Sequence, residues 1–574
     1  MWGCFATSNL MRWAGALRPA VMTACSHVSC LRWVWILFSS WLGIEAATAG
    51  PPGVHGIQEF VFHAGSTPTN PYQEISAEAT LSRPDGTVGN LPLFWDGGDV
   101  WKLRVASDQR GIWRWKIASS DAALNGQSGE WTCVEIAKPG LQRMKEQEAH
   151  FGRQDGTRVW FMGDTQWALF NDIPRKGFDR AAARAYLKTR AEQGFNTISA
   201  MLLSEADLEN SGGPPFHSVA DEMLNPAFWR EVDERLAFAN DCGLNVGLFL
   251  AWAAKSGNEA YAWGRFPSRE SRKRFARYVA ARYGAFDVYF IVAGEWYGEV
   301  KTRVGATEGQ IQQEFVDLGT ELQAADFHRR MIGIHPMSRH SVREFNPVAP
   351  WMSFGDYQQN YRDLHASVLQ SRSFGKPVVN SEYGYLFRSS HAASHGKADK
   401  DNSQDAEVMR HATWDIAMAG GYVVTGFGTT YFGGLRDAGP FDLMAAKNRP
   451  WEEQMGCLRS FFEKWSWWQL LPQDEWVTCA QPRGQDRILE GQVAPPEVTY
   501  WCLADPVGKV QIIYVRGVHT PLRIQHFFEA GTLRAQVFDL RSGAVSSGKV
   551  TTAAGGLSWT PPDERDWVLA LTLK

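Results

Sequence analysis

Residues 286–300 read FDVYFIVAGEWYGEV, an apolar run that ends abruptly on an acid and two aromatic residues. The run Val288–Val292 has the composition of a strand that is buried on both faces, as in parallel sheets covered by helices. Glu295 then stands at the carboxyl end of that strand, where parallel α/β folds collect their reactive groups. Taken alone, Glu295 is more simply interpreted as a solvated strand-end carboxylate. The rest of the chain therefore has to decide between these two interpretations.

Seven more apolar stretches of this kind occur between residues 138 and 470, and amphipathic segments such as residues 179–194 and 226–243 separate most of them. Eight βα units in about 300 residues predict a (β/α)8 TIM barrel. A doubly wound open sheet is the rival, but it usually carries a glycine-rich phosphate-binding turn after its first strand, which MGDTQW at 162–167 is not. The predicted strands are RVWFMGDT (158–165), NTISAMLL (196–203), NVGLFLAW (245–252), VYFIVAGE (288–295), RMIGIHP (330–336), WMSFGDYQ (351–358), PVVNSEYG (377–384) and GGYVVTGFG (420–428).

The regions on either side of the barrel show short alternating strands separated by turn residues, which predicts a β-sandwich at residues 50–137 and another at residues 471–574. The predicted fold class is thus α/β, with a barrel flanked by two β-sandwich domains. In the first sandwich, Asp96 and Asp99 of the WDGGD turn could hold a structural calcium ion, although an ordinary turn role is the simpler expectation.

Length and composition limit the function classes. A chain of 574 residues is too long for one core, so two to four domains are expected. The formal net charge of -4 provides no basic surface, which argues against nucleic acid as a partner. The 26 tryptophans are unusual. Such a surplus fits either core packing or flat platforms for sugar rings, and it mildly favours a carbohydrate ligand.

Residues 1–49 differ from the rest and predict a signal peptide. Arg32 precedes an apolar segment at 33–44, and Ala47 and Ala49 follow in the small-residue pattern that signal peptidase cuts. The leader is long, as it would be if synthesis started at Met11 or Met22. The segment is short for a membrane span, and no later stretch is long enough. We expect a secreted or periplasmic protein without an integral membrane span after cleavage.

Cysteine usage gives no disulfide framework. Three of the eight cysteines lie in the leader, and no CxxC pair suggests zinc. Cys479 and Cys502 could pair across neighbouring strands, and two buried free thiols are an equal alternative. The cysteines left after cleavage are Cys133, Cys242, Cys457, Cys479 and Cys502.

Polar and aromatic residues end six of the eight predicted strands. Any one of them could be a cap or a solvated side chain, but all lie on the carboxyl side, where a barrel gathers its pocket. We therefore predict a substrate pocket that needs no metal or cofactor. Its predicted substrate-binding residues are Asp164, Trp167, Trp252, His335, Asp356, Tyr357, Gln358 and Tyr383.

Two carboxylates in this set fit glycoside hydrolysis, which needs one group to protonate the leaving oxygen and one to attack or to activate water. Glu295 after the fourth strand and Glu382 after the seventh lie on opposite sides of an eight-stranded barrel and would face one another. Tyr383 could hold Glu382 ionised, while apolar neighbours favour protonated Glu295. Glu299 is the alternative acid. A carboxyl separation of about 5 Å supports retention and about 6.5–9.5 Å inversion.

Other chemistries lack their motifs: the chain has no G-x-S-x-G, H-E-x-x-H or P-loop sequence and no Cys/His cluster. The glycine-rich stretch GFGTTYFGG at 426–434 follows the last predicted strand and is interpreted as the rim of the pocket.

Several motifs resemble the apiosidase-like glycoside hydrolases. Residues 70–86 and 91–115 resemble the β-sandwich that often precedes such a barrel in exported bacterial proteins. VWFMGDTQWALF (159–170), SEYGY (381–385) and RHATWDIAMAGGYVVTGFGTTYFGG (410–434) resemble the barrel itself. The tail, ending DWVLALTL at 566–573, is similar to a small β-domain that has carried a collagen-binding label, which we do not transfer.

This resemblance implies a catalytic pair at the ends of strands 4 and 7, which are Glu295 and Glu382 here. The chain departs from the family pattern at strand 4. The apiosidase-like pattern has Gly-Gly-Asp there and the wider clan has Asn-Glu, whereas this chain reads Ala293-Gly294-Glu295. The resemblance therefore gives no expectation for the sugar.

The leading hypothesis is an exported glycoside hydrolase acting on a plant or microbial polysaccharide. The alternative is a carbohydrate-binding surface protein whose barrel is catalytically inactive, and loss of either glutamate would have favoured it. A structural or adhesive protein built on the two sandwiches is a third possibility, but it leaves the strand-end polar residues unexplained.

Overall fold

The structure is a computed structural model of the chain. The predicted leader, apart from Thr48–Ala49, and the predicted rim at 427–434 lie outside the residues it describes. Those residues are 48–49, 56–174, 177–203, 209–253, 263–337, 340, 345, 349–358, 362–384, 403–426, 449–489, 492–528 and 532–574.

Eight parallel strands form the centre of the molecule, and all eight strands predicted from the sequence are confirmed. Their order in the sheet is β18-β17-β16-β13-β12-β21-β20-β19. A parallel bridge between Ile332 and Met352 joins the two ends of this order, so that the sheet is a nearly closed barrel. The strands are β12 (Met162–Thr165), β13 (Thr197–Met201), β16 (Asn245–Phe249), β17 (Val288–Ile291), β18 (Ile332–Gly333), β19 (Gly355–Tyr357), β20 (Val378–Asn380) and β21 (Tyr422–Thr425).

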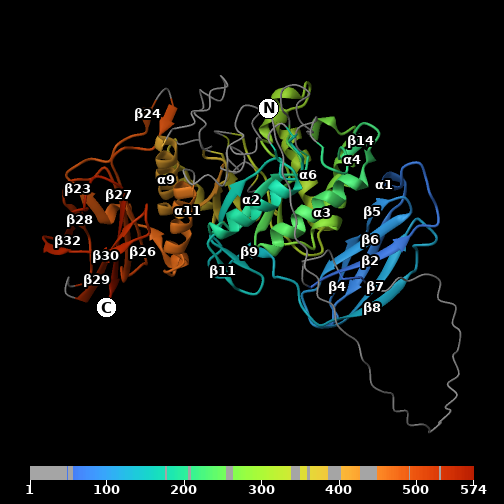
Figure 1. The fold of residues 1–574 in the computed structure, drawn as a ribbon, viewed down its shortest axis with the longest axis horizontal. Helices are drawn as coiled ribbons and strands as arrows, with labels where there is room; N and C mark the ends of the chain where they lie inside the picture. The colour runs from blue at the N-terminus through green and yellow to red at the C-terminus, as the bar shows by residue number, and fades with distance from the viewer. Residues whose placement is uncertain are drawn as a thin grey trace, which may run out of the picture. The chain divides into compact units, whose positions relative to one another are not determined.

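Helices follow these strands and cover the barrel (Figure 1). Several of them begin at side-chain caps. The Asp179 side chain accepts a hydrogen bond from Ala182 N at the start of α2, and Ser268 forms a capping box with Ser271 at the start of α4. The helices are α2 (Arg180–Glu192), α3 (Pro226–Asp241), α4 (Arg269–Tyr283), α5 (Tyr297–Thr302), α6 (Glu308–Ala325), α7 (Leu364–Ser371), α9 (Ser403–Met418) and α11 (Arg449–Phe462). None of these helices is long and apolar enough to cross a membrane.

The N-terminal region is a sandwich of two antiparallel sheets, β1-β2-β6-β5 and β4-β3-β7-β8, which lie as two layers (Figure 1). Side chains alternate along strand β7: Trp113, Trp115 and Ile117 are buried, whereas Arg114 and Lys116 between them are exposed. The elements are β1 (Thr48–Ala49), β2 (Ile57–His63), α1 (Pro71–Glu74), β3 (Ala77–Ser82), β4 (Val88–Pro92), β5 (Phe94–Gly97), β6 (Val100–Ala106), β7 (Gly111–Ser119) and β8 (Ser128–Cys133).

The C-terminal region is a second sandwich, with sheets of order β22-β26-β27-β33-β29-β30 and β23-β28-β32-β31. It is fixed to helix α9 by two buried ion pairs, Arg516–Asp415 at 3.1 Å and Arg410–Asp566 at 2.7 Å. Its strands are β22 (Leu471–Pro472), β23 (Val477–Cys479), β26 (Thr499–Ala504), β27 (Val510–Arg516), β28 (Leu522–Ile524), β29 (Leu533–Asp539), β30 (Val545–Ser547), β31 (Thr551–Ala553), β32 (Gly556–Trp559) and β33 (Trp567–Leu573).

The remaining strands form small antiparallel sheets outside the barrel and the sandwiches. They are β9 (Leu141–Arg143), β10 (Phe151–Arg153), β11 (Arg158–Val159), β14 (Phe216–Ser218), β15 (Met223–Leu224), β24 (Arg487–Leu489) and β25 (Gln492–Ala494).

Tryptophans belong mainly to the cores. No tryptophan is among the exposed large hydrophobic residues of the described chain. The tryptophan surplus therefore reflects packing more than a sugar-stacking surface. All five described cysteines are free, and Cys479 Sγ lies 3.0 Å from Thr520 Oγ1. The largest fully buried tryptophans are Trp113, Trp229, Trp263, Trp296, Trp351 and Trp414.

Candidate active site

The carboxyl end of the barrel holds the residues that the sequence selects. Glu295 follows β17 and Glu382 follows β20, the fourth and seventh barrel strands in chain order. Both glutamates are half-buried. The eight predicted substrate-binding residues, by contrast, are all buried, from 0% exposed for Asp164 to 7% for Tyr357. The two proposed catalytic residues are thus the members of the predicted set with the most access to solvent.

Glu295 has a constrained backbone. Its φ of 46° lies in the left-handed region, which costs a non-glycine residue about 1–3 kcal/mol and persists only where the surroundings fix it. The residue before it has to be a glycine, because a Cβ on Gly294 would lie 2.1 Å from the Trp252 ring. Trp252 Nε1 donates a hydrogen bond of 3.0 Å to Glu295 Oε2. Trp252 therefore orients the carboxyl group of Glu295.

Glu382 lies beside a buried histidine. His335 Nε2 is 3.3 Å from Glu382 Oε2, and its Nδ1 is 3.1 Å from Asp356 Oδ2 and 2.9 Å from Ser381 Oγ. Burial alone lowers the pKa of His335, but the Asp356 and Glu382 carboxylates outweigh burial and raise the pKa to about 10. The imidazole is therefore an imidazolium at neutral pH, and its positive charge stabilises the Glu382 carboxylate.

The raised pKa of His335 predicts a pH dependence of stability. Protonated His335 contributes to the free energy of unfolding. This contribution is fully present below about pH 6.5, the pKa of histidine in the unfolded state, and it is lost as the pH rises toward the folded-state pKa of about 10. Between pH 6.5 and pH 9 this loss amounts to about 3 kcal/mol. We expect His335→Gln to remove this loss of stability. The measurement is the difference between the free energies of unfolding in urea at pH 6.5 and at pH 9. His63→Gln, at an exposed position, should keep the wild-type slope. An unchanged slope in His335→Gln would contradict a charged His335.

Other predicted site residues have contacts within the protein. Asp164 is fully buried, and Arg190 Nε donates to its Oδ2 at 2.7 Å and Thr425 Oγ1 to its Oδ1 at 2.7 Å. Burial raises the pKa of Asp164, although Arg190 opposes this rise. The Tyr383 hydroxyl, which we expected near Glu382, lies 2.6 Å from Thr413 Oγ1. These contacts favour structural roles for Asp164 and Tyr383.

The remaining predicted binding residues divide into aromatic and polar groups. Trp167 packs edge-on against Trp252, with ring centroids 5.4 Å apart, so it supports the tryptophan that orients Glu295. Asp356 Oδ1 and Gln358 Oε1 are buried oxygens for which the described residues supply no hydrogen bond. Since buried oxygens normally have partners, these two are candidate acceptors in the site. Tyr357 lies between them in sequence, at 7% exposure.

Glu299, the alternative acid, is in a buried ion pair. It lies on α5 at 2% exposure, and Arg272 Nη2 donates to its Oε1 at 2.7 Å. Arg303 Nη1 also donates to Oε1, at 3.3 Å. Because these two arginine contacts hold Glu299 at a buried position, they favour a structural role for it over the role of the acid. The sequence offered no sign of this pairing, since Arg272 lies 27 residues earlier. Among the described residues, no three acidic, histidine or cysteine side chains are arranged to hold a metal ion.

Several solved structures share this fold, among them the following three. A Bacteroides vulgatus protein provisionally described as a glycoside hydrolase has a TM-score of 0.66 and 18% identity, over 90% of this chain and 98% of that one. A glycoside hydrolase family 5 protein from Bacteroides vulgatus has a TM-score of 0.58 and 14% identity, over 75% and 93%. A protein described as a glycoside hydrolase has a TM-score of 0.58 and 16% identity, over 76% and 97%. At these identities the likeness concerns the fold.

Family models identify the chain more closely, although no curated protein matches it. The model described as a domain of unknown function, DUF5060, matches residues 53–120, within the N-terminal sandwich. The model described as the catalytic domain of the apiosidase-like family matches residues 145–469, more than half of the chain, and covers every candidate site residue. The chain therefore belongs to the apiosidase-like family and is a glycoside hydrolase.

Proposed function

We propose that this protein is an exported glycoside hydrolase that cleaves a plant or microbial polysaccharide with Glu382 as nucleophile and Glu295 as acid and base. The observation that carries the proposal is the contrast between the two glutamates. Glu382 faces the His335 imidazolium at 3.3 Å, which favours an anion that can attack carbon. Glu295 receives a hydrogen bond from the neutral indole of Trp252 at 3.0 Å. This hydrogen bond holds the carboxyl group in a fixed orientation, as a group that passes a proton to and from the glycosidic oxygen requires.

The proposed reaction has two steps. Glu382 attacks the anomeric carbon while Glu295 protonates the departing oxygen, and a glycosyl ester forms on Glu382. Glu295 then takes a proton from water, which attacks the same carbon and releases the sugar with retained configuration. In this scheme Asp356 and Gln358 accept hydrogen bonds from sugar hydroxyl groups, and Trp252 and Trp167 hold the acid in position. The export that the leader at residues 1–49 predicts is part of the same proposal.

A substrate screen with product analysis tests the proposed function. Purified protein would be incubated with a panel of plant cell-wall and microbial oligosaccharides, and the products would be analysed by chromatography and mass spectrometry. We expect at least one glycosidic bond to be cleaved by the wild type and not by Glu382→Gln prepared in parallel. Cleavage of equal rate in both samples would point to a contaminating enzyme and contradict the assignment.

A further inference from the structure

The N-terminal sandwich has a hydrophobic core of its own, and a few of its residues also join the core of the barrel. Phe94 on β5 and Tyr72 on α1 both pack edge-on against Tyr278 of helix α4, with ring centroids 6.3 Å and 5.7 Å apart. Phe94 and Tyr72 belong to the same continuous cluster of buried residues as the barrel strands. A domain that is attached only through a flexible linker would bury no residues against its neighbour. The sandwich, by contrast, packs directly against helix α4.

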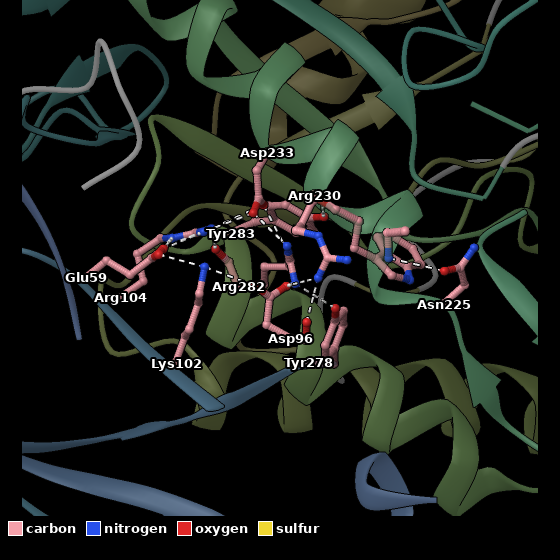
Figure 2. Close-up of polar contacts among 12 residues, drawn as sticks. Glu59, Asp96, Lys102, Arg104, Asn225, Arg230, Asp233, Tyr278, Arg282 and Tyr283 are labelled. Atoms are coloured by element: carbon pink, nitrogen blue, oxygen red, sulfur yellow. Dashed lines mark hydrogen bonds and ion pairs between the residues drawn. The ribbon is translucent and has the colours of Figure 1, made fainter. Parts of the chain in front are cut away.

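Two buried arginines cross this interface (Figure 2). Arg104, on sandwich strand β6, is 1% exposed and donates to Asp233 on α3 through Nη1 at 3.2 Å and Nη2 at 3.0 Å. Its Nη1 also donates to the carbonyl of Arg282 at 2.6 Å. Arg282, on α4, is fully buried and donates to Asp233 Oδ2 at 2.7 Å and to Asp96 Oδ1 of the sandwich at 2.9 Å. Each domain thus supplies a cation and a carboxylate to the other.

The two buried arginines of this network have all their carboxylate partners only when both domains are present. Burial raises the pKa of Asp233, but Arg104 and Arg282 outweigh it, so that the pKa is lowered and the carboxylate is ionised. Glu59 and Lys102, both from the sandwich, complete the set, with Lys102 Nζ 2.9 Å from Glu59 Oε1. Because a buried charge that loses its partner is strongly destabilising, separating the two domains at this network would be costly. Asp96 is committed to this network, and Asp99 pairs with His63 at 3.0 Å, which gives both aspartates of the WDGGD turn a role without calcium.

Helix α4 connects the network to Glu295. Its last residue, Tyr283, adjoins Arg282, and β17 begins at Val288, seven residues before Glu295. Near its other end, Arg272 donates to Glu299 of α5 at 2.7 Å, just beyond Glu295. The backbone from 284 to 299 is therefore held by α4 on both sides of Glu295. The left-handed φ of 46° at Glu295 needs such restraint.

We propose that the N-terminal sandwich is a positioning part of the active site, in which Arg104 and Asp96 fix helix α4 and thereby the backbone that presents Glu295. Arg104 acts here as a positioning residue and does not touch the substrate. The inference rests on the proposed function for the role of Glu295. The restraint itself is a property of the fold that can be measured without a substrate.

Arg104→Met tests the proposal with a limited risk of unfolding. The side chain keeps its length, and the two carboxylates that lose Arg104 keep one cation each: Asp233 keeps Arg282 at 2.7 Å and Glu59 keeps Lys102 at 2.9 Å. The matched control is Arg114→Met on strand β7, where the exposed Arg114 pairs with Glu130 at the surface of the same sandwich. Amide hydrogen exchange of residues 288–299 is the primary measurement.

We expect exchange of residues 288–299 to accelerate about tenfold in Arg104→Met and to stay at the wild-type rate in Arg114→Met. With an active substrate, kcat should fall about tenfold while KM changes less than about twofold, because the acid is displaced and the sugar contacts are intact. Arg104→Lys keeps the positive charge but cannot make the bidentate contact with Asp233. Its exchange rate and its kcat should lie between those of the wild type and Arg104→Met.

Unchanged exchange at residues 288–299, with faster exchange confined to the sandwich, would overturn the inference whether or not a substrate is known. If Arg104→Met does not fold, Asp96→Asn provides the same test, since it removes a carboxylate from Arg282 with almost no change in size. A failure of the proposed function would be recognised separately, because the wild type would then cleave no sugar. Hydrogen exchange would still show whether the sandwich restrains the backbone around Glu295.

Discussion

Glu382→Gln is expected to lower kcat about 10⁴-fold or more while KM stays close to that of the wild type. The amide keeps the size and shape of the carboxylate, so the substrate still binds, but an amide oxygen does not attack the anomeric carbon to form a glycosyl ester. The contact with His335 Nε2, now 3.3 Å from Glu382 Oε2, can be kept as a hydrogen bond to the amide oxygen. The loss should therefore appear in turnover and much less in folding or binding.

Three measurements distinguish a loss of catalysis from a loss of binding or folding, and a retaining from an inverting reaction. Steady-state kinetics separate kcat from KM, thermal unfolding shows that the variant is folded, and NMR of the first-formed product gives its anomeric configuration. Glu308→Gln is the matched control, because Glu308 is an exposed glutamate in the first turn of α6, and it should keep wild-type turnover. Retained configuration agrees with a nucleophilic Glu382. Inverted configuration would make Glu382 a base that acts through water, and full activity of Glu382→Gln would contradict the site.

The barrel could be predicted from the sequence because its strands are buried on both faces. A continuous apolar run such as Val288–Val292 is a strong signal, and each of the eight runs becomes a parallel strand. Helices α2 and α3 start and end close to the predicted segments 179–194 and 226–243, since Asp179 and Asn225 cap their first turns. Local chemistry was sufficient for these elements.

Side-chain partners could not be predicted, because they depend on distances between segments far apart in the chain. Asp96 reads as a turn residue, yet it pairs with Arg282, 186 residues later. Trp252 reads as a sugar platform, yet its indole donates to Glu295, 43 residues away. Periodicity gives the face on which a side chain lies and does not give the group that meets it. The carboxyl-end location of Glu295 and Glu382 follows from topology alone, which explains why it was accessible to sequence reasoning.

Glu295 variants are expected to depend on the leaving group. As the acid, Glu295 matters most when the departing oxygen is a poor leaving group, as in natural glycosides. Glu295→Gln should therefore nearly abolish cleavage of natural oligosaccharides. The first step on aryl glycosides with good leaving groups should be spared, and a burst of released phenol followed by slow turnover should result, because the second step still lacks its base.

Added azide separates this role from a structural one. In Glu295→Ala the space left by the side chain admits a small anion, which attacks the glycosyl ester on Glu382 without needing a base. Azide should therefore restore turnover of aryl glycosides and yield a glycosyl azide of retained configuration. Trp252→Phe is the accompanying variant: it keeps a ring against Gly294 but removes the 3.0 Å hydrogen bond to Glu295. Its turnover should fall less than that of Glu295→Ala and should not respond to azide, because its general base is still present. Absence of azide rescue in a folded Glu295→Ala would move the acid and base role to another residue.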